Sequence, residues 1–159
     1  MYQVVLVEPK IPQNTGSIAR LCAATGTQLH LIEPLGFEIT ESRVKRAGLD
    51  YWKFVDLSTH RSLEELTIDS CSSRFCFFSK KARKTYVDAG FQGDEMLVFG
   101  SETDGLEDGL LARYEKDCFR IPIFEPGVRS LNLANAVSIV LYEALRQSGR
   151  LTSRKTSSG

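Results

Sequence analysis

Closely spaced cysteines and histidines are missing from this sequence. Its 159 residues include four cysteines with no CxxC pair, and its two histidines, His30 and His60, have no metal-ligand neighbours at usable spacing. Zinc sites and disulfide frameworks both depend on such spacing. We therefore expect buried free thiols and no metal.

Long apolar runs and an excess of charge of one sign are missing too. No stretch approaches the roughly 20 apolar residues of a membrane helix, and no basic leader precedes the first strand-like segment. A cytoplasmic protein that does not bind a membrane is expected. Lys plus Arg and Asp plus Glu each total 20. A nucleic-acid partner would therefore be held by local basic patches rather than by net charge.

The familiar nucleotide-binding and hydrolase motifs are also absent. Gly100 and Gly105 have the spacing of a P-loop, but Leu106 and Glu107 follow where Lys and Ser or Thr would hold phosphate and magnesium. No G-x-G-x-x-G motif follows a strand, and there is no G-x-S-x-G elbow. These absences argue against a kinase, an NTPase, a dehydrogenase and an esterase.

What is present is an alternation of short apolar runs with helical patterns. The runs predict strands over residues 2–7, 28–32, 74–78, 96–99 and 119–123. They are uniformly apolar, which is typical of strands buried on both faces of a parallel sheet. Helices are predicted from Asn14 or Thr15, either of which can act as the cap, to Gly26, and over residues 41–47, 62–66 and 106–113.

A last helix is predicted near the C-terminus. Its apolar stripe consists of Leu133, Val137, Val140, Leu141 and Ala144, a spacing that places all five on one face. Strands alternating with helices predict an α/β fold, with a mostly parallel sheet and helices on both faces. One domain over residues 1–151 is expected, followed by a polar, flexible tail over residues 152–159.

Three polar loops, residues 8–16, 100–105 and 125–132, each follow a predicted strand and lead into a helix. Ligands of open α/β sheets bind outside the carboxyl ends of the strands, so these loops are expected to converge on one crevice. Singly, their residues have structural interpretations, with Asn14 and Asn132 as helix caps, glycines as turn formers and Arg20 as a solvated side chain. Their joint presence favours a shared site.

Four segments carry a family resemblance. They are EPKIPQNTGSIARLCAATG (residues 8–26), HLIEPLGFEITESRVKRAGLD (30–50), LVFGSETDG (97–105) and RSLNLANAVSIVLYEALRQ (129–147). Together they resemble the motifs of the SPOUT methyltransferases, and most of all the small TrmL/YibK group, the tRNA (cytidine/uridine wobble) 2′-O-methyltransferases. The resemblance extends over about residues 2–149.

The resemblance implies more than the patterns alone. It implies a C-terminal deep trefoil knot (the SPOUT or α/β knot), although chains are in general unknotted. It also implies a homodimer whose active site contains residues of both subunits. The implied reaction transfers a methyl group from S-adenosyl-L-methionine to the ribose 2′-hydroxyl of the wobble nucleotide in the anticodon loop of tRNA, with leucine tRNA as the expected substrate.

Site residues follow from the matched motif positions. The implied donor pocket comprises Phe78, Gly100, Ile121, Ser130 and Leu131. The implied polar catalytic positions are Asn14, Arg20, Glu102, Ser130 and Asn132. Because a guanidinium is effectively always protonated, we interpret Arg20 as a group that pairs with RNA phosphate and stabilises developing alkoxide charge, rather than as the base.

The sequence departs from the family pattern in two places. Ser101 replaces a proline and Asp104 an arginine in the second loop, and residues 124–128 differ from the commoner forms. These departures affect RNA contacts more than the reaction. Candidate RNA-binding cations form two groups, Arg43, Lys45, Arg46 and Lys53, and Lys80, Lys81, Arg83 and Lys84; solvated surface is the alternative for both.

The sequence leaves two other functions open. The same chemistry can act on ribosomal RNA or on another tRNA position, and the absence of an attached RNA-binding domain favours the wobble nucleotide. A non-catalytic RNA-binding dimer of the same fold is the alternative from a different class, and the joint presence of the polar positions argues against it.

Overall fold

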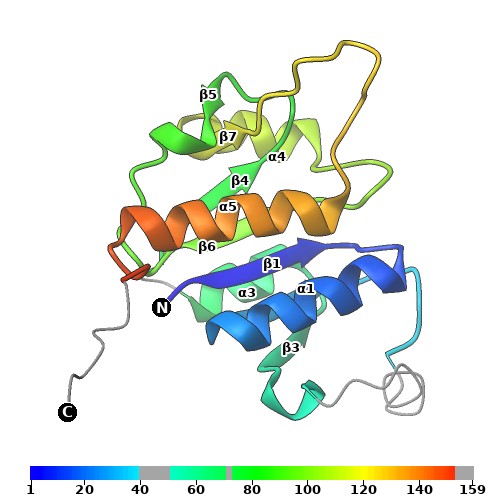
Figure 1. Cartoon of the computed structure of the whole chain (residues 1–159). Helices are drawn as coiled ribbons and strands as arrows, with labels where there is room; N and C mark the ends of the chain where they lie inside the picture. Colours follow the sequence, from blue (N-terminus) through cyan, green and yellow to red (C-terminus); the bar gives the residue numbers. More distant parts are fainter. Residues whose placement is uncertain (40–50, 71–72, 153–159) are drawn as a thin grey trace, which may run out of the picture.

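The computed structural model describes residues 1–39, 51–70 and 73–152, and its centre is a parallel seven-stranded sheet (Figure 1). Its order is β3-β2-β1-β6-β4-β7-β5, so non-consecutive strands are neighbours at the centre. The strands are β1 (Gln3–Val7), β2 (Gln28–Ile32), β3 (Leu57–His60), β4 (Phe75–Phe78), β5 (Lys84–Thr85), β6 (Met96–Phe99) and β7 (Cys118–Arg120). The predicted α/β fold with its parallel sheet is confirmed.

Helices cover both faces of the sheet. They are α1 (Pro12–Thr25), α3 (Leu63–Asp69), α4 (Asp108–Arg113) and α5 (Leu133–Gln147), with 3₁₀ turns η1 (Trp52–Phe54), η2 (Tyr86–Asp88) and η3 (Glu115–Asp117). In Figure 1, α1 and α5 lie side by side in front of the sheet, and α3 and α4 lie behind it. The predicted helix over residues 41–47 is outside the described residues.

Each face of the sheet has its own hydrophobic core. Alternate residues of one strand belong to different cores, as Leu97 and Phe99 pack with α1 and α5 while Met96 and Val98 pack with α3 and α4. This two-sided burial explains the uniformly apolar strands. The described free cysteines, Cys22, Cys76 and Cys118, are buried as expected, and burial raises the pKa of the Cys22 and Cys76 thiols to about 12.

The strand predictions hold at the centre of the sheet and fail at its edges. Strands β1, β2, β4 and β6 form where predicted. Strand β7 ends at Arg120, earlier than predicted, because Pro122 cannot donate a ladder hydrogen bond. Strands β3 and β5 were not predicted, since β3 is a mixed polar edge strand and β5 has only two residues.

The first helix begins earlier than predicted, and neither predicted cap acts as one. Helix α1 starts at Pro12 with Ile11 at the N-cap position and no side-chain cap, which suits the fixed φ of proline in the first turn. Asn14 and Thr15 are therefore inside the helix and buried. The predicted stop at Gly26 is confirmed, with φ of 63° in the left-handed region that glycine tolerates.

The C-terminal helix forms as predicted. All five residues of its apolar stripe are buried against the sheet and α1. Asn132 caps it, because its Oδ1 accepts from the backbone N–H groups of Ala134 at 2.9 Å and Asn135 at 3.3 Å. None of the described helices is long and apolar enough to cross a membrane.

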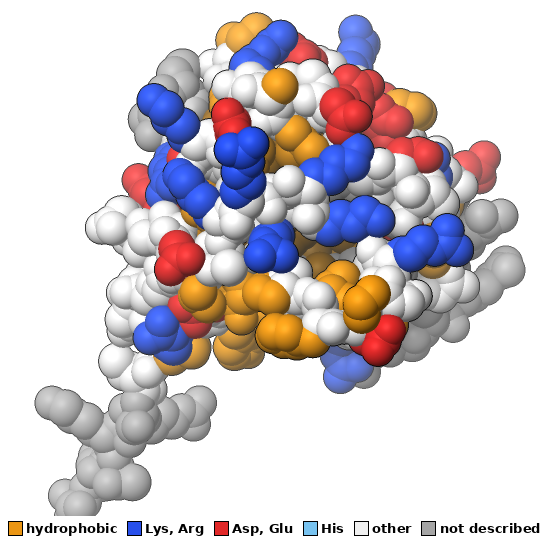
Figure 2. All heavy atoms as spheres, turned by 90° about the horizontal axis from the view of Figure 1, so that it is seen from above, with side chains coloured by type: hydrophobic (Ala, Val, Ile, Leu, Met, Phe, Trp, Pro, Cys, Tyr) orange, Lys and Arg blue, Asp and Glu red, His pale blue; other side chains and the backbone are white. Residues whose placement is uncertain are grey.

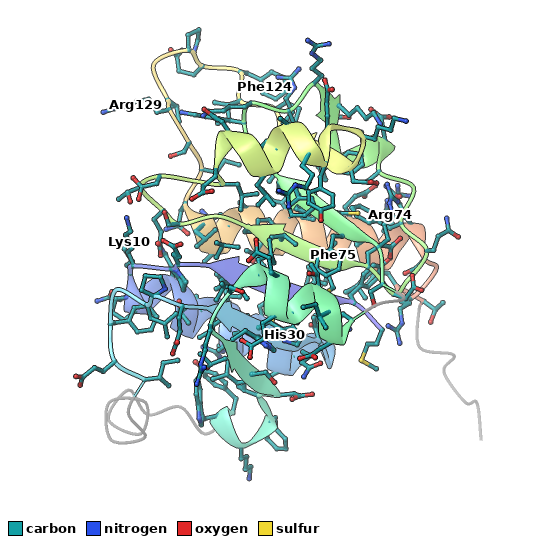
Figure 3. All side chains as sticks on the ribbon, turned by 180° about the vertical axis from the view of Figure 1, so that it is seen from behind. Lys10, His30, Arg74, Phe75, Phe124 and Arg129 are labelled. Carbon is teal, nitrogen blue, oxygen red and sulfur yellow. The ribbon has the colours of Figure 1, made fainter. Side chains whose placement is uncertain are left out.

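A hydrogen-bonded pair of histidines, the buried His30 and the half-buried His60, connects three strands (Figure 3 labels His30). His30 Nε2 donates to Gln3 Oε1 at 2.7 Å, which leaves its Nδ1 to accept from His60 Nε2 at 3.0 Å. Both contacts use the neutral form of His30. Burial, and then the neighbouring His60, lower the pKa of His30 from 6.5 to about 4.

This pair predicts acid-sensitive stability. Above about pH 6.5 His30 is neutral in folded and unfolded chains, whereas between about 6.5 and 4 only the unfolded chain takes up the proton. The free energy of unfolding should therefore fall by about 1.4 kcal/mol per pH unit over that window from this group. Urea denaturation across the window tests this, with His30→Gln as the non-titrating control; an equally steep decline in both proteins would contradict the assignment.

Candidate active site

Four loops converge on one pocket of about 640 Å³ at the carboxyl ends of β1, β4, β6 and β7. The three predicted loops all contribute, and the loop after β4 adds Ser79, Lys80 and Lys81. The site therefore lies where a parallel sheet presents loops from separated parts of the chain.

Three polar side chains form a chain of hydrogen bonds at this pocket. Asn132 Nδ2 donates to Asn14 Oδ1 at 2.9 Å, and Asn14 Nδ2 donates to Glu102 Oε1 at 3.2 Å. One residue from each predicted loop takes part. The chain fixes the orientation of both amides, because each has a donor and an acceptor end in use.

Glu102 ties the second loop to the start of α1. Its carboxylate accepts from the backbone N–H groups of Lys10 at 2.8 Å and Ile11 at 3.1 Å, as well as from Asn14. Burial alone would raise the pKa of Glu102, but these hydrogen bonds outweigh it and lower the pKa below its usual value. Glu102 is therefore an ionised carboxylate with its oxygens already occupied, which suits a positioning role.

A second link joins the same two loops at the surface. The Lys10 ammonium donates to Thr103 Oγ1 at 3.0 Å and pairs with Asp104. The hydrogen bond with Asp104 raises the pKa of Lys10, and the bond from Lys10 lowers the pKa of Asp104. Asp104, one of the departures from the family pattern, thus holds the loop by an ion pair with the loop after β1.

Gly100 is required by the close approach of two backbone segments. A Cβ at this position would lie 2.1 Å from the carbonyl carbon of Gly105 and 2.4 Å from Leu106 N. The turn is closed by a hydrogen bond from Gly105 N to Ser101 O at 3.0 Å, with Gly105 at φ of 68°. The pocket wall here is main chain, which a side chain would displace.

The structure brings together eight of the nine predicted site positions. The pocket is lined by Asn14, Phe78, Gly100, Glu102, Ile121, Ser130, Leu131 and Asn132, among others. The ninth position, Arg20, does not line it. Arg20 is exposed on α1, and its guanidinium carbon lies 5.5 Å from the centre of the Tyr51 ring.

Sequence reasoning missed two residues near these positions, Lys10 and Tyr51. Tyr51 lies under Arg20 and donates to the carbonyl oxygen of Gly16 at 3.3 Å. Tyr51 lies far from α1 along the chain, so no sequence pattern indicated that the two would be in contact. Lys10 lay within a predicted loop, but only its ion pair with Asp104 distinguishes it.

An Asn14→Asp variant tests whether the amide is required. The new carboxylate would face Glu102 across the 3.2 Å contact, so the free energy of unfolding near pH 7 should drop by about 1–3 kcal/mol. Acidification should restore part of the loss, because one carboxyl of a close pair binds a proton with a raised pKa. Urea denaturation at several pH values measures both effects. Asn135→Asp, exposed in the first turn of α5, is the control and should change little.

Comparison with known proteins assigns the chain to a family. The family model described as SpoU rRNA Methylase family matches residues 1–142. The chain belongs to the SpoU rRNA Methylase family. The resemblance of its motifs is thereby confirmed at family level. In the described part of this SpoU family member, no group of three or more His, Cys, Asp or Glu side chains is placed to hold a metal ion.

Several proteins are similar to this SpoU family member over nearly its whole length. One from Listeria monocytogenes is 48% identical over 147 residues, covering 91% of this chain and 86% of that protein. A protein from Burkholderia pseudomallei named tRNA (cytidine(34)-2′-O)-methyltransferase is 43% identical over 152 residues, covering 94% of this chain and 97% of its own.

Solved structures agree with this assignment. A structure described as structural insights into the 2-OH methylation of C/U34 on tRNA has a TM-score of 0.87 and 44% identity, covering 94% of this chain and 97% of its own. The SpoU methyltransferase AviRb from Streptomyces viridochromogenes, in complex with the cofactor AdoMet, shares the fold at a TM-score of 0.78 and 24% identity, covering 96% of this chain and 58% of its own.

Proposed function

We propose that this protein transfers a methyl group from S-adenosyl-L-methionine to the ribose 2′-hydroxyl of the wobble nucleotide, cytidine or uridine 34, of a tRNA. The observation that carries the proposal is the row of hydrogen bonds Asn132–Asn14–Glu102 in the lining of the pocket. These hydrogen bonds join the motif residues of three separate loops. The polypeptide that contains them is 43% identical, over nearly its full length, to a protein named for this reaction.

The pocket suits the proposed donor. Its volume of about 640 Å³ lies in the usual range for small-molecule sites. Phe78, Ile121 and Leu131 supply apolar surface for a purine, and the main chain around Gly100 supplies polar groups at close approach. When bound, the donor supplies an electrophilic methyl group on a sulfonium, so no metal is required.

The chain's own residues would prepare the hydroxyl. Ser130 and the amides of Asn132 and Asn14 orient the ribose, while Glu102 keeps both amides in one orientation. Holding the reacting groups in line removes much of the entropic barrier. Arg20 pairs with an RNA phosphate and stabilises the negative charge that develops on the 2′-oxygen as the hydroxyl proton passes to solvent water.

We also propose a homodimer whose site is shared between subunits. Arg20 follows Asn14 by six residues on α1, which turns its side chain by roughly 240° around the helix and moves it about 9 Å along the axis. It therefore points away from the pocket that Asn14 lines, and we infer that it serves the pocket of a second copy. Exposed Ile139 and Tyr142 on α5, which packs beside α1, offer apolar surface for that contact.

Mixing two inactive variants tests the shared site. Arg20→Ala and Asn132→Ala should each be inactive alone. After equilibration at equal concentrations, about a quarter of wild-type activity should return, since half of the dimers are mixed and each mixed dimer holds one intact site. No recovery, despite a sedimentation profile showing exchange into dimers, would place each site within one subunit.

The finer features of the family resemblance complete the proposal. We propose that the C-terminal third forms a deep trefoil knot; the placement of α5 against the middle of the sheet, after β7 near one edge, is consistent with such a crossing. We further propose that residues 1–151 are one domain with a flexible tail, that the protein acts in the cytoplasm, and that leucine tRNA is its substrate.

Nucleoside mapping tests the reaction. The purified protein is incubated with total tRNA, ribosomal RNA and isotopically labelled S-adenosyl-L-methionine, and the RNA is digested and sequenced for 2′-O-methylation. Label at nucleotide 34 of leucine tRNA is the expected result. Label at nucleotide 34 of other tRNAs alone would replace the leucine assignment. Label at another tRNA position or in ribosomal RNA would overturn the wobble assignment. RNA binding without any label would show that the protein binds RNA but does not methylate it.

A further inference from the structure

Phe124 is the most exposed large hydrophobic residue in the described part of the chain, with 93% of its surface exposed. It lies on the segment 121–132 between β7 and α5, which arches away from the body of the molecule in Figure 1. Large apolar side chains in such positions typically mark a binding surface. The residue before it, Ile123, lines the pocket, so Phe124 directly follows the pocket lining.

The arch is closed by hydrogen bonds on the C-terminal side of Phe124. Val128 N donates to Glu125 O at 3.0 Å, and Gly127 N donates to Glu125 Oε1 at 2.9 Å, which closes a turn directly after Phe124. Lys80 Nζ donates to the carbonyl oxygen of Arg129 at 3.2 Å and so links the returning leg to the loop after β4. Because the backbone next to Phe124 is already fixed, less conformational entropy is lost when a ligand binds there.

Cations gather at the pocket that the arch borders. Lys80, Lys81 and Arg129 all line the pocket. Lys81 pairs with Asp108 at 2.5 Å, whereas no ion pair with a described residue is seen for Lys80 or Arg129. Figure 2, which looks down on this side, shows Lys and Arg side chains gathered across it, and Figure 3 shows Arg129 projecting outward from the arch that carries Phe124.

We propose that Phe124 stacks on an anticodon-loop base next to the methylated nucleotide, with Lys80 and Arg129 contacting the adjoining phosphates. Single-stranded RNA is typically bound by unstacked bases on aromatic side chains and by phosphates on nearby cations. A protein partner would leave those cations without a counterpart, whereas RNA matches both the aromatic surface and the charge. The inference rests on the proposed function, because it takes the RNA to be an anticodon loop.

A cycle of protein and RNA changes tests the stacking. Binding of Phe124→Ala and of wild type is measured with an anticodon stem-loop of about 17 nucleotides. Two further stem-loops carry an abasic site, one on the 5′ side and one on the 3′ side of the wobble nucleotide. Phe124→Ala should weaken binding of the intact stem-loop by about 5- to 150-fold, the range of one stacked base. On the stem-loop that lacks the stacked base, Phe124→Ala and wild type should bind equally tightly. Phe124→Trp should bind as tightly as wild type, and Phe124→Leu should resemble Phe124→Ala.

Controls separate stacking from other roles. Val128→Ala, which shortens another exposed apolar side chain on the same turn, should leave RNA affinity unchanged. Donor affinity and sedimentation should be the same for wild type and Phe124→Ala. A smaller assembly for Phe124→Ala and Phe124→Trp would show that Phe124 contacts a second copy instead, and equal losses on every stem-loop would also overturn stacking.

The two proposals fail in different ways. If wild type methylates nucleotide 34 but Phe124→Ala binds the stem-loop as tightly as wild type, the stacking role is wrong and the reaction stands. If wild type leaves nucleotide 34 unmodified, the proposed reaction is wrong. Abasic-sensitive binding to another single-stranded loop would then retain the stacking role of Phe124 on a different RNA.

Discussion

Arg20→Ala is expected to lower the rate of methyl transfer by at least about 10²-fold while leaving donor affinity nearly unchanged. A guanidinium contributes charge stabilisation rather than proton removal. Loss of one preorganised group that faces developing negative charge typically costs about 10²–10³-fold in kcat. Because Arg20 does not line the pocket of its own chain, the donor contacts remain. Single-turnover kinetics and donor titration measure the two quantities separately.

Arg20→Lys and Arg61→Ala complete this experiment. Lysine keeps the charge but not the planar fork, so a partial loss is expected. Arg61 is another exposed arginine, placed just before α3 on the opposite face of the sheet, and its removal should have little effect. Unchanged turnover in Arg20→Ala would remove Arg20 from the mechanism, and a matching loss of donor affinity would assign it to the donor site instead.

Gly100→Ala is expected to weaken donor binding by at least about tenfold and to destabilise the fold by about 1–3 kcal/mol. The added methyl group would overlap the backbone of Gly105 and Leu106, neither of which can move without opening the turn. The cause is therefore overpacking between two main-chain segments rather than loss of a contact. Isothermal titration with the donor and urea denaturation measure the two effects.

Gly109→Ala is the matched control for this change. Gly109 lies in α4, and a Cβ there meets nothing within 4 Å. Alanine in an unstrained helical position typically stabilises a protein slightly. A normal donor affinity in Gly100→Ala would show that the turn relaxes without disturbing the pocket, and it would contradict a role of this turn in donor binding.

Local patterns were sufficient to predict the centre of the fold. Strand β6 is apolar and buried at all four positions, and β1 is apolar and buried at its three central ones, so their composition alone distinguishes them. Strand β3 carries Ser58, Thr59 and His60 at the edge of the sheet, where one side is open and polar residues are tolerated. Its pairing depends on β2 next to it, which no local pattern contains.

The sequence predicted which residues belong to the site better than it predicted the contacts between them. Motif positions identified Asn14, Glu102 and Asn132, but the interpretation of Asn14 as a helix cap was wrong. Proline at the first position of α1 moved the start of the helix, which put Asn14 inside it and freed its amide for the pocket. Contacts such as Arg20 over Tyr51 join residues about 30 positions apart and required the folded chain.

The two ends of the Asn132 amide serve different parts of the molecule. Its oxygen holds the first-turn amides of α5, and its nitrogen holds Asn14 beside the pocket. A ligand that binds the Asn132 side chain therefore also affects the first turn of α5, the longest described helix. Occupancy of the site should consequently be readable, without any enzymatic assay, as slowed hydrogen–deuterium exchange at the amides of Ala134 and Asn135.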